Sequence, residues 1–340
     1  MSQTLPKTMK AAYVHKNGES TVSGTISVVE DHPVPKPAKG QILVKVHAAA
    51  INPVDWKMIE GKFPGIKEGV VGCDVSGTVA TIGPNTTTTL NVGDEVYGDI
   101  ISTKGAFGEY ALADEPAMAK KPSKLSMEEA AALPLAGLTA IQGLTVHGKM
   151  EKGSKVLIFG GSGGVGSLAI QMAKALGASE VYATGSDVEM IKGFGADKVI
   201  NYKEESLMDA LKGKDFDVVY DTIGGYEHWE IAQKSMKSSG GNYVTIVGDG
   251  TSFTMTILST IWRKLSAKVF GGPQYNIFLA DASAPAVVND MKTITELVEN
   301  GSVKPVLDKQ RFQLTTEGIH DMMKASKSHR AKGKLVLKVV

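Results

Sequence analysis

The sequence predicts an α/β protein in which a doubly wound parallel sheet is inserted into a β-barrel domain. Up to about Leu133, short strand-like runs are separated by turns rich in glycine and proline, which is typical of an antiparallel barrel. From there to Gly272, strand-like and helical segments alternate, which is typical of a parallel sheet covered by helices. Beyond Gly272, strand-like runs return without a new glycine-rich turn. The predicted domains are therefore residues 1–133 plus 273–340, the barrel, and residues 134–272, the nucleotide-binding domain.

Six strand-like runs predict the barrel domain. Each alternates apolar with polar or small residues, the period of a strand that buries one face. In chain order they read MKAAYVH, TISVVE, QILVKVHAAAI, DVSGTVATIG, GDEVYG and FGEYALA. The cluster of Pro33, Pro35 and Pro37 is expected to be loop, because proline lacks the N–H that a strand ladder needs.

The inserted domain begins with the strand-like VLIFG, which a glycine-rich turn joins to the helical pattern SLAIQMAKALG. Gly177 is expected to cap that helix. The next segments, in strict alternation, are VYAT, a helix over 188–194, KVIN, a helix over 204–212, and DVVYD. NYVTIV and AKVFGG are predicted as the fifth and sixth strands. In the C-terminal part, a helix over 289–300 precedes the strand-like RFQL and KLVLKVV.

Composition and charge exclude several classes of protein. The chain has 340 residues, of which 42% are apolar and 21% charged, as in ordinary globular proteins. A net charge of +1 provides no field for nucleic acid or an anionic membrane, so we expect neither as a partner. The most apolar stretch, 130–144, is shorter than the roughly 20 residues of a membrane span. Cys73 is the only cysteine, and no targeting signal is evident, so we expect a cytoplasmic location.

A glycine-rich turn is the strongest functional motif. It places Gly161, Gly163 and Gly166 in the G-x-G-x-x-G spacing, directly after a strand and before a helix. The first glycine permits a tight turn, the second lets the backbone approach a pyrophosphate, and the third lets the helix pack on the strand. The helix N-terminus then attracts the anion. We predict that a dinucleotide binds at Gly161, Ser162, Gly163, Gly164, Val165 and Gly166.

The end of the second strand of this domain selects between cofactors. An acidic side chain there would hold the ribose hydroxyls and reject a 2′-phosphate. Gly185 and Ser186 are small and neutral, which favours NADPH, with Ser186, Lys192 and Tyr202 as candidate phosphate donors. Asp187 opposes this interpretation unless it caps the following helix.

Later strand ends are expected to contribute to the same crevice, because ligands in such sheets bind at the carboxyl ends of the strands. At the ends of the fourth, fifth and sixth predicted strands stand Asp221, Gly248, Phe270 and Gly272.

The glycine-rich turn allows a competing interpretation, because its residues GGSGG also match the G-x-S-x-G nucleophile elbow of serine hydrolases. The triad partners of Ser162 would be His320 or His329 with Asp308 or Asp321. The barrel-like pattern before the motif and the continuation of the glycine run to Gly166 disfavour this alternative.

The chain as a whole resembles the medium-chain dehydrogenase/reductase superfamily. The segments that carry the resemblance are INPVDWKMIEG, GCDVSGTV, GDEVYG, FGEYALA, LPLAGLTA, GGSGGVG, GADKVINY and GKLVL. NPVDWK and GGNYVTIVGD are similar to the zinc-independent quinone oxidoreductase group, especially the branch of reticulon-4-interacting protein 1 and the plant enone or quinone reductases. The resemblance implies a Rossmann sheet inserted in a GroES-like barrel, and NADPH-dependent reduction of quinones or α,β-unsaturated carbonyls.

Zinc members of this superfamily bind their catalytic metal with cysteine, histidine and cysteine. The resemblance puts Asn52 and Cys73 at the first two of these positions and the third near Ala136 or Gly137. Since zinc needs about four nitrogen, sulfur or carboxylate ligands, we expect no metal. Without a Lewis acid, reduction of a conjugated acceptor is easier than oxidation of an alcohol. Cys73 is expected to be a small buried residue.

The resemblance implies that Asn52, Asp55 and Lys57 lie at the nicotinamide. Lys57 would donate to a developing enolate; alternatively it is a surface lysine. Asn52 would orient the substrate; alternatively it caps a turn. Asp55 would act at the nicotinamide; alternatively it only pairs with a neighbouring residue. Many relatives have tyrosines where this chain has Lys57 and Phe63.

Two further cofactor contacts follow from the resemblance. Thr139 matches a residue at the nicotinamide, unless it is a helix-interior threonine, and Lys334 matches a lysine near the cofactor. A homodimer is also implied, through the predicted sixth strand at 268–271. A second hypothesis is an NADPH-binding interaction or sensor protein with little turnover, because a fold alone does not settle function.

Overall fold

The computed structural model describes residues 5–15, 25–64, 66, 68–248 and 253–340, which form two compact units. Unit 1 comprises the described residues up to Leu135 together with Asp281–Glu299 and Pro305–Val340. Unit 2 comprises Ala136–Ala280 and Asn300–Lys304. The C-terminal part of the chain thus returns to the unit that contains the N-terminal part.

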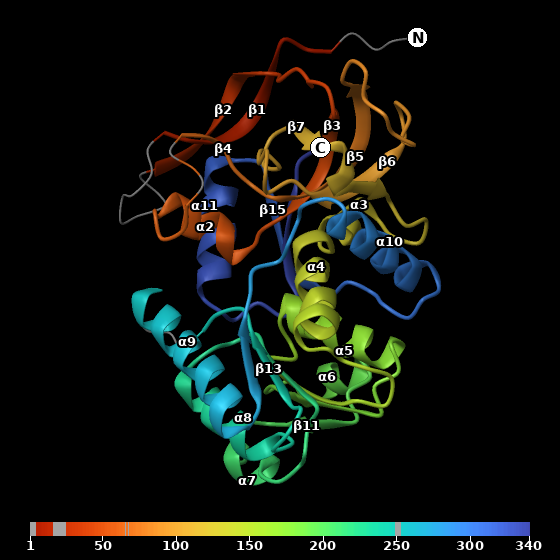
Figure 1. The fold of residues 1–340 in the computed structure, drawn as a ribbon. Helices are drawn as coiled ribbons and strands as arrows, with labels where there is room; N and C mark the ends of the chain where they lie inside the picture. Colours follow the sequence, from red (N-terminus) through yellow and green to blue (C-terminus); the bar gives the residue numbers. More distant parts are fainter. Residues whose placement is uncertain (1–4, 16–24, 65, 67, 249–252) are drawn as a thin grey trace. The chain divides into compact units, whose positions relative to one another are not determined.

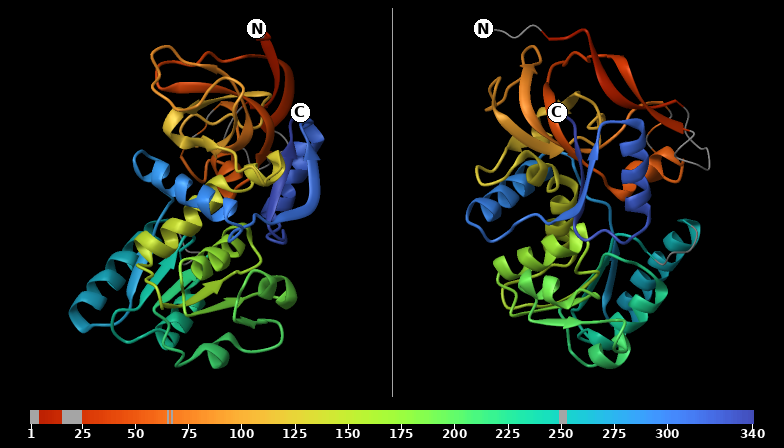
Figure 2. Two further views of the ribbon diagram at one scale, coloured as in Figure 1. Left: turned by 90° about the vertical axis from the view of Figure 1, so that its right-hand side faces the viewer. Right: turned by 180° about the vertical axis from the view of Figure 1, so that it is seen from behind.

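Unit 1 is built on two sheets, as its alternating runs predict. One has the strand order β2-β1-β4, and the other has the order β15-β16-β3-β5-β6-β8, with β7 also paired to β3. Figure 2 shows β16 beside β3, although almost the whole chain separates them in sequence. The strands are β1 Thr8–Val14, β2 Ile26–Pro33, β3 Gln41–Ala50, β4 Gly69–Val70, β5 Asp74–Ile82, β6 Glu95–Asp99, β7 Tyr110–Asp114, β8 Met118–Lys120, β15 Leu307–Gln313 and β16 Lys334–Lys338.

Helical segments connect the strands of unit 1. They are α2 Pro53–Ile59, the 3-10 turn η1 Glu115–Ala117, α3 Met127–Ala131, α10 Ala286–Glu299 and α11 Thr316–Lys327. The sequence predicted the one at 289–300, which is α10. The segments of three to seven residues were missed because they are too brief for a helical period, whereas the helix at 316–327 has 12 residues and was also missed. Helix α2 begins after Asn52, has proline in its first turn, and uses the Asp55 carboxylate to accept from the Asn52 N–H at 2.7 Å. These local contacts fix the start of the helix that carries three predicted site residues.

Unit 2 contains the predicted doubly wound sheet. Its six parallel strands have the order β11-β10-β9-β12-β13-β14. Helices α5 and α6 cover one face of the sheet, and α8 and α9 cover the other (Figure 1). The strands are β9 Lys155–Phe159, β10 Glu180–Thr184, β11 Lys198–Ile200, β12 Val218–Asp221, β13 Asn242–Thr245 and β14 Gln274–Ile277. The helices are α4 Pro134–Gln142, η2 Gly143–His147, α5 Gly164–Ala175, α6 Val188–Gly193, α7 Leu207–Leu211, α8 Tyr226–Ser235 and α9 Phe253–Phe270.

The predicted sixth strand is wrong. AKVFGG does not form a strand, because its first residues are the end of α9, and the sixth strand is β14, which follows them. Phe270 and Gly272 therefore lie before the amino end of β14, not at a carboxyl end. Of the dimer strand expected at 268–271, residues 268–270 are helical and Gly271 lies in neither a helix nor a strand. Residues 274–277 belong to the parallel sheet, although the sequence assigned 273–340 to the barrel.

Aromatic side chains hold α9 on the sheet through Arg263. Arg263, almost buried on α9, places its guanidinium 4.5 Å from the ring centre of Tyr275 and 5.2 Å from that of Trp229. Arg263 is thus on the buried face of α9, whereas the apolar residues next to it face solvent. An amphipathic helix on a sheet usually has its apolar residues on the buried face, so α9 shows the reverse arrangement.

Among the described residues, no helix combines the length and the apolar character needed to cross a bilayer.

Candidate active site

The glycine-rich turn joins the carboxyl end of β9 to the N-terminus of α5. Gly160 has φ +84°, a conformation that favours glycine, and the N–H of Gly161 donates to Thr184 O at 2.9 Å. Gly163 is the residue before the first helical turn and accepts from the N–H of Ser167 at 2.9 Å. The turn is thereby fixed against both β10 and α5.

Two of its glycines differ in whether the fold itself requires them. A Cβ on Gly166 would lie 2.1 Å from the carbonyl oxygen of Gly160, closer than any side chain tolerates. A Cβ on Gly163 would meet only that same oxygen, at an ordinary 3.5 Å. The fold therefore needs glycine at 166, whereas at 163 the protein itself leaves room for a methyl group.

The start of α5 is suited to an anion. The first N–H groups of a helix have no partner within it, which leaves those of Gly164, Val165 and Gly166 for a ligand. The first turn contains no acidic residue that would oppose a phosphate. The residues present thus fit a dinucleotide diphosphate, and Ser162 is part of the same turn.

At the end of β10, the acidic residue is occupied elsewhere. Asp187 caps α6, where its carboxylate accepts from the N–H of Met190 at 3.3 Å, in agreement with the helix-cap alternative. A Cβ on Gly185 would lie 2.3 Å from Ile191 Cδ1, so a side chain there would require Ile191 to move. The proposed phosphate donors Ser186, Lys192 and Tyr202 are all exposed. Lys192 Nζ lies 3.3 Å from Glu189 Oε1.

Asp221 is fully buried and organises the turn after β12. Its Oδ1 accepts from the N–H groups of Ile223 and Gly224, both at 2.9 Å. The Tyr243 hydroxyl donates to its Oδ2 at 2.6 Å, and His228 Nδ1 lies 3.1 Å from Oδ1. Asp221 thus fixes the backbone of the turn after β12, since both of its oxygens are engaged inside the unit.

The other predicted strand-end residues differ in placement. Gly248 accepts from the N–H of Gly225 at 2.8 Å, which joins the turns after β12 and β13. The Thr139 carbonyl accepts from the Tyr220 hydroxyl at 2.7 Å, so this threonine is fixed within α4. The carboxyl end of the sixth strand is occupied by Phe278, which sequence reasoning missed and which stacks on His147 with ring centres 4.2 Å apart.

In unit 1, Asn52 belongs to a buried polar cluster. Its Nδ2 donates to Asp74 Oδ2 at 2.8 Å, and its Oδ1 accepts from the ammonium of Lys334. Lys334 Nζ also lies 3.0 Å from Asp74 Oδ2 and donates to Ile51 O at 3.2 Å. Asp74 was not predicted as a site residue, although it stands in the quoted segment GCDVSGTV.

Asp55 and Asp99 extend this cluster with protonatable groups. Burial raises the pKa of the Asp55 carboxyl to about 7, against the opposing effects of the Asn52 N–H and the Cys73 thiol. Burial and the charge of Asp74 also raise the pKa of Asp99. Cys73 is fully buried, as expected, and burial and Asp55 raise the pKa of its thiol.

The raised pKa of Asp55 predicts a pH-dependent stability. Between the ordinary pKa of 3.8 and about 7, the folded carboxyl retains its proton while the unfolded one loses it. The free energy of unfolding should therefore fall as the pH rises through this window. Asp55→Asn removes the titration, so the difference between urea unfolding free energies at pH 5 and pH 8 should shrink. An unchanged difference in this variant would show that Asp55 does not titrate in the window.

Lys57 is half-buried on α2 beside Trp56. Its Nζ lies 5.6 Å from the centre of the Trp56 ring, and burial together with Lys62 lowers the pKa of its ammonium. Lys62 and Lys327 both form ion pairs with Glu60. Within the described part of the chain, Lys57 has no such carboxylate partner, which leaves its ammonium available to a ligand.

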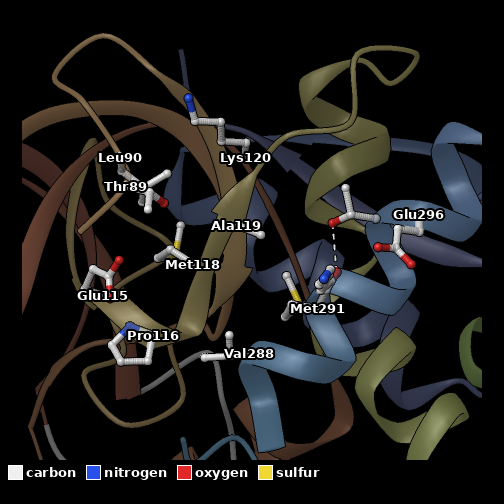
Figure 3. Close-up of a pocket in the computed structure, with 12 residues that line it drawn as sticks. Thr89, Leu90, Glu115, Pro116, Met118, Ala119, Lys120, Val288, Met291 and Glu296 are labelled. Atoms are coloured by element: carbon white, nitrogen blue, oxygen red, sulfur yellow. Dashed lines mark hydrogen bonds between the residues drawn. The ribbon is translucent and has the colours of Figure 1, made fainter. Parts of the chain in front are cut away.

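A separate groove of about 440 Å³ lies on unit 1. Residues of β8 and η1 line one side and residues of α10 the other, including Met118 and Met291 (Figure 3). Thr295 Oγ1 donates to Met291 O at 2.8 Å at its edge. None of its lining residues belongs to the Asn52 cluster, so the groove has no part in that site.

Comparisons with known proteins agree with this architecture. A family model described as alcohol dehydrogenase GroES-like domain matches residues 38–123, and one described as zinc-binding dehydrogenase matches residues 194–337. The 2-methylene-furan-3-one reductase of Solanum lycopersicum is 36% identical over 99% of this chain and 80% of its own length. The chloroplastic NADPH-dependent alkenal/one oxidoreductase of Arabidopsis thaliana is 36% identical over 79% of this chain and 71% of its own.

Among solved structures, the quinone oxidoreductase from Coxiella burnetii superposes with a TM-score of 0.79. It is 29% identical, and the match covers 98% of this chain and 99% of that one. The resemblance on which the sequence interpretation depends is thereby confirmed. The chain belongs to the medium-chain dehydrogenase/reductase superfamily, in its quinone and enone oxidoreductase group.

Proposed function

We propose that this protein is a zinc-independent, NADPH-dependent reductase of quinones or α,β-unsaturated carbonyls that acts by direct hydride transfer. The observation that carries the proposal is the glycine turn between β9 and α5, where Gly166 is sterically required and the helix N–H groups are free for a diphosphate. The similarity to the furanone reductase of Solanum lycopersicum and the alkenal/one oxidoreductase of Arabidopsis thaliana supports the choice of acceptor.

The preference for NADPH is supported by the end of β10. A carboxylate facing the ribose would repel a 2′-phosphate, but Asp187 is used as the cap of α6. Ser186, Lys192 and Tyr202 provide exposed donors near that strand end, of which Lys192 can exchange Glu189 for a phosphate. NADH, which lacks this phosphate, is expected to bind more weakly.

Zinc independence is supported by the donor set of the described residues. They contain no group of three or more His, Cys, Asp or Glu side chains placed to hold a metal ion. The position of the first zinc ligand is occupied by Asn52, whose amide oxygen already accepts from Lys334. A fixed ammonium beside that oxygen would repel a divalent cation.

The chain's own groups supply donors for the carbonyl oxygen of the acceptor. Bound NADPH supplies the hydride, and negative charge then develops on that oxygen. We assign Asn52 Nδ2 and Lys57 Nζ as the donors that stabilise it, and water as the source of the final proton. Asp55 is assigned a positioning role, because it is buried and holds the N–H of Asn52 at 2.7 Å.

Steady-state oxidation of NADPH with benzoquinone, phenanthrenequinone and simple enones tests the proposal. We expect turnover with at least one acceptor, and no loss of activity after dialysis against a zinc chelator. NADPH binding without turnover on any acceptor would instead favour the interaction or sensor hypothesis. Labelling of Ser162 by a fluorophosphonate would support the hydrolase alternative.

We also propose a homodimer, now through β14 and α9. Strand β14 is at the edge of the six-stranded sheet, so it can pair with its symmetry mate. Helix α9 beside it exposes apolar side chains at helical spacing, each between 51% and 71% accessible. This stripe comprises Leu258, Ile261, Trp262, Leu265 and Val269. Such a contiguous exposed stripe is typical of an interface.

A charge on the stripe should separate the subunits. We expect Leu265→Glu to convert a dimer into a monomer in sedimentation velocity, because the carboxylate would be buried without a partner. Val92→Glu is the matched control, since Val92 is an equally exposed apolar residue of unit 1. A monomeric wild-type protein, or a dimeric Leu265→Glu variant, would contradict this interface.

A cytoplasmic location and the absence of nucleic-acid and membrane partners stay predictions from the sequence. The net charge of +1, in which acidic and basic residues nearly cancel, supports the absence of nucleic-acid and membrane partners. Imaging of the tagged full chain in its own cells tests the location.

A further inference from the structure

The ammonium of Lys334 is enclosed by oxygen atoms of its own unit. It donates to Ile51 O at 3.2 Å, to Asp74 Oδ2 at 3.0 Å and to Asn52 Oδ1, and the side chain is only 7% exposed. An ammonium has three N–H bonds, and these three acceptors use them all. Lys334 thus has no donor left for the cofactor contact that the sequence suggested.

The Asn52 side chain is held at both ends of its amide. Oδ1 accepts from Lys334, and Nδ2 donates one hydrogen to Asp74 Oδ2 at 2.8 Å. A lysine can only donate and a carboxylate mainly accepts, so the orientation of the amide is determined by chemistry. One Nδ2 hydrogen remains, and it has no acceptor among the described residues. Asn52 therefore presents a single N–H in a fixed direction.

Asp74 connects this pair to a third segment of the chain. Its Oδ1 accepts from the N–H of Leu135 at 2.8 Å, while Oδ2 accepts from Asn52 and Lys334. Asp74 thus connects the segments around Asn52, Cys73 and Leu135. The sequence resemblance implies that zinc-dependent relatives have their three zinc ligands in these segments. An internal ion pair occupies the centre of this arrangement.

We propose that Lys334 is a positioning residue for the reduction, and that its buried ammonium both orients and polarises the Asn52 amide. A cation bound to Oδ1 draws electron density from the amide, which strengthens the free Nδ2–H as a donor. That N–H would then stabilise the oxygen of the acceptor as it becomes negative. Lys334 itself touches neither acceptor nor cofactor. The inference rests on the proposed function and adds the residue that orients and polarises its oxyanion donor.

A double-mutant cycle tests the coupling of the two residues. We compare Lys334→Met, Asn52→Ala and the double variant by kcat and KM for NADPH and for the acceptor. Each single change should lower kcat about a hundredfold, the usual cost of one oxyanion donor, with little change in the dissociation constant of NADPH. In the Asn52→Ala background, Lys334→Met should have almost no further effect on kcat. Lys338→Met, at the exposed end of the same strand, is the matched control and should retain wild-type rates.

Several outcomes would overturn the inference. Multiplicative losses in the double variant would show that Lys334 acts independently of Asn52. A Lys334→Met variant that loses NADPH affinity but keeps kcat would instead be a cofactor contact. A wild-type kcat in Asn52→Ala would show that Asn52 does not stabilise the acceptor oxygen, so that Lys334 cannot act through it. The proposed function would still stand in that case, because the wild-type protein turns over.

Loss of folding must be separated from loss of function, because Lys334→Met leaves Asp74 buried without its cation. The comparison therefore includes the double variant Asp74→Asn/Lys334→Met, in which both members of the ion pair are replaced and no charge is left buried alone. We expect this variant to melt at a higher temperature than Lys334→Met and to have a kcat about a hundredfold below that of the wild type. A kcat equal to that of the wild type would show that the ammonium has only a structural role. Absence of turnover in the wild type would contradict the proposed function instead.

Discussion

Replacing Gly163 with alanine should raise the dissociation constant of NADPH tenfold to a hundredfold without loss of the fold. Each tenfold change corresponds to about 1.4 kcal/mol. The added Cβ would lie at an ordinary 3.5 Å from Gly160 O, and the residue already has φ −76°, which alanine adopts freely. The methyl group would instead occupy the space through which the diphosphate approaches the backbone. Fluorescence titration of NADPH, with thermal unfolding of the same samples, measures both effects.

Two other glycines provide the controls for this result. Gly166→Ala should destabilise the protein by about 2 kcal/mol or more, because its Cβ would meet a backbone oxygen at 2.1 Å that cannot move away. Gly193→Ala, at the end of α6, meets no atom within 4 Å and should change neither property. If Gly163→Ala binds NADPH as tightly as the wild type, the diphosphate does not bind at this turn.

Lys57→Met should lower kcat for enones about a hundredfold and leave NADPH affinity nearly unchanged. Methionine keeps the length of the side chain and its contact with Trp56 but removes the ammonium that we assign to the developing oxyanion. Lys62→Met is the matched control, because Lys62 lies near the same ring but pairs with Glu60 at 2.8 Å. Equal rates for Lys57→Met and the wild type would make Lys57 a bystander.

The pH dependence of kcat provides a second readout on Lys57. The ammonium donates only while protonated, and burial with the neighbouring Lys62 lowers its pKa from the ordinary 10.5. Activity should therefore decline as the pH rises through that lowered value, earlier than an unperturbed lysine would allow. Lys57→Arg should shift the decline to higher pH, since a guanidinium keeps its proton. A decline at the same pH in Lys57→Arg would assign it to another group.

The strands and the glycine turn could be predicted because their signals are local. Alternation along β7 or an apolar run such as β9 reports directly which faces are buried. The end of α9 could not be predicted in this way. Its polar Arg263 faces the core against Tyr275, and its apolar face is exposed, so the usual relation between period and burial is inverted.

The functional residues also divide into those with a local sequence signal and those without one. The turn at 161–166 carries its own chemistry in its spacing, and the sequence alone points to it. The Asn52 cluster depends on contacts between distant segments, since Lys334 meets Asp74 across 260 positions. No local pattern distinguishes Lys334 from the exposed lysines around it, and only the folded chain shows that its ammonium is buried. For the same reason the sequence did not identify Asp74 or Asp99.

Transfer of deuterium from NADPH labelled at C4 to an enone tests the proposed reaction most directly. The product is analysed by NMR after turnover in ordinary water, with each stereospecifically labelled form of NADPH used in turn. We predict that one of the two labels appears at the β-carbon of the product, while the α-carbon takes its hydrogen from water. A reduced product without deuterium at the β-carbon from either label, or no product at all, would contradict direct reduction of the acceptor by NADPH.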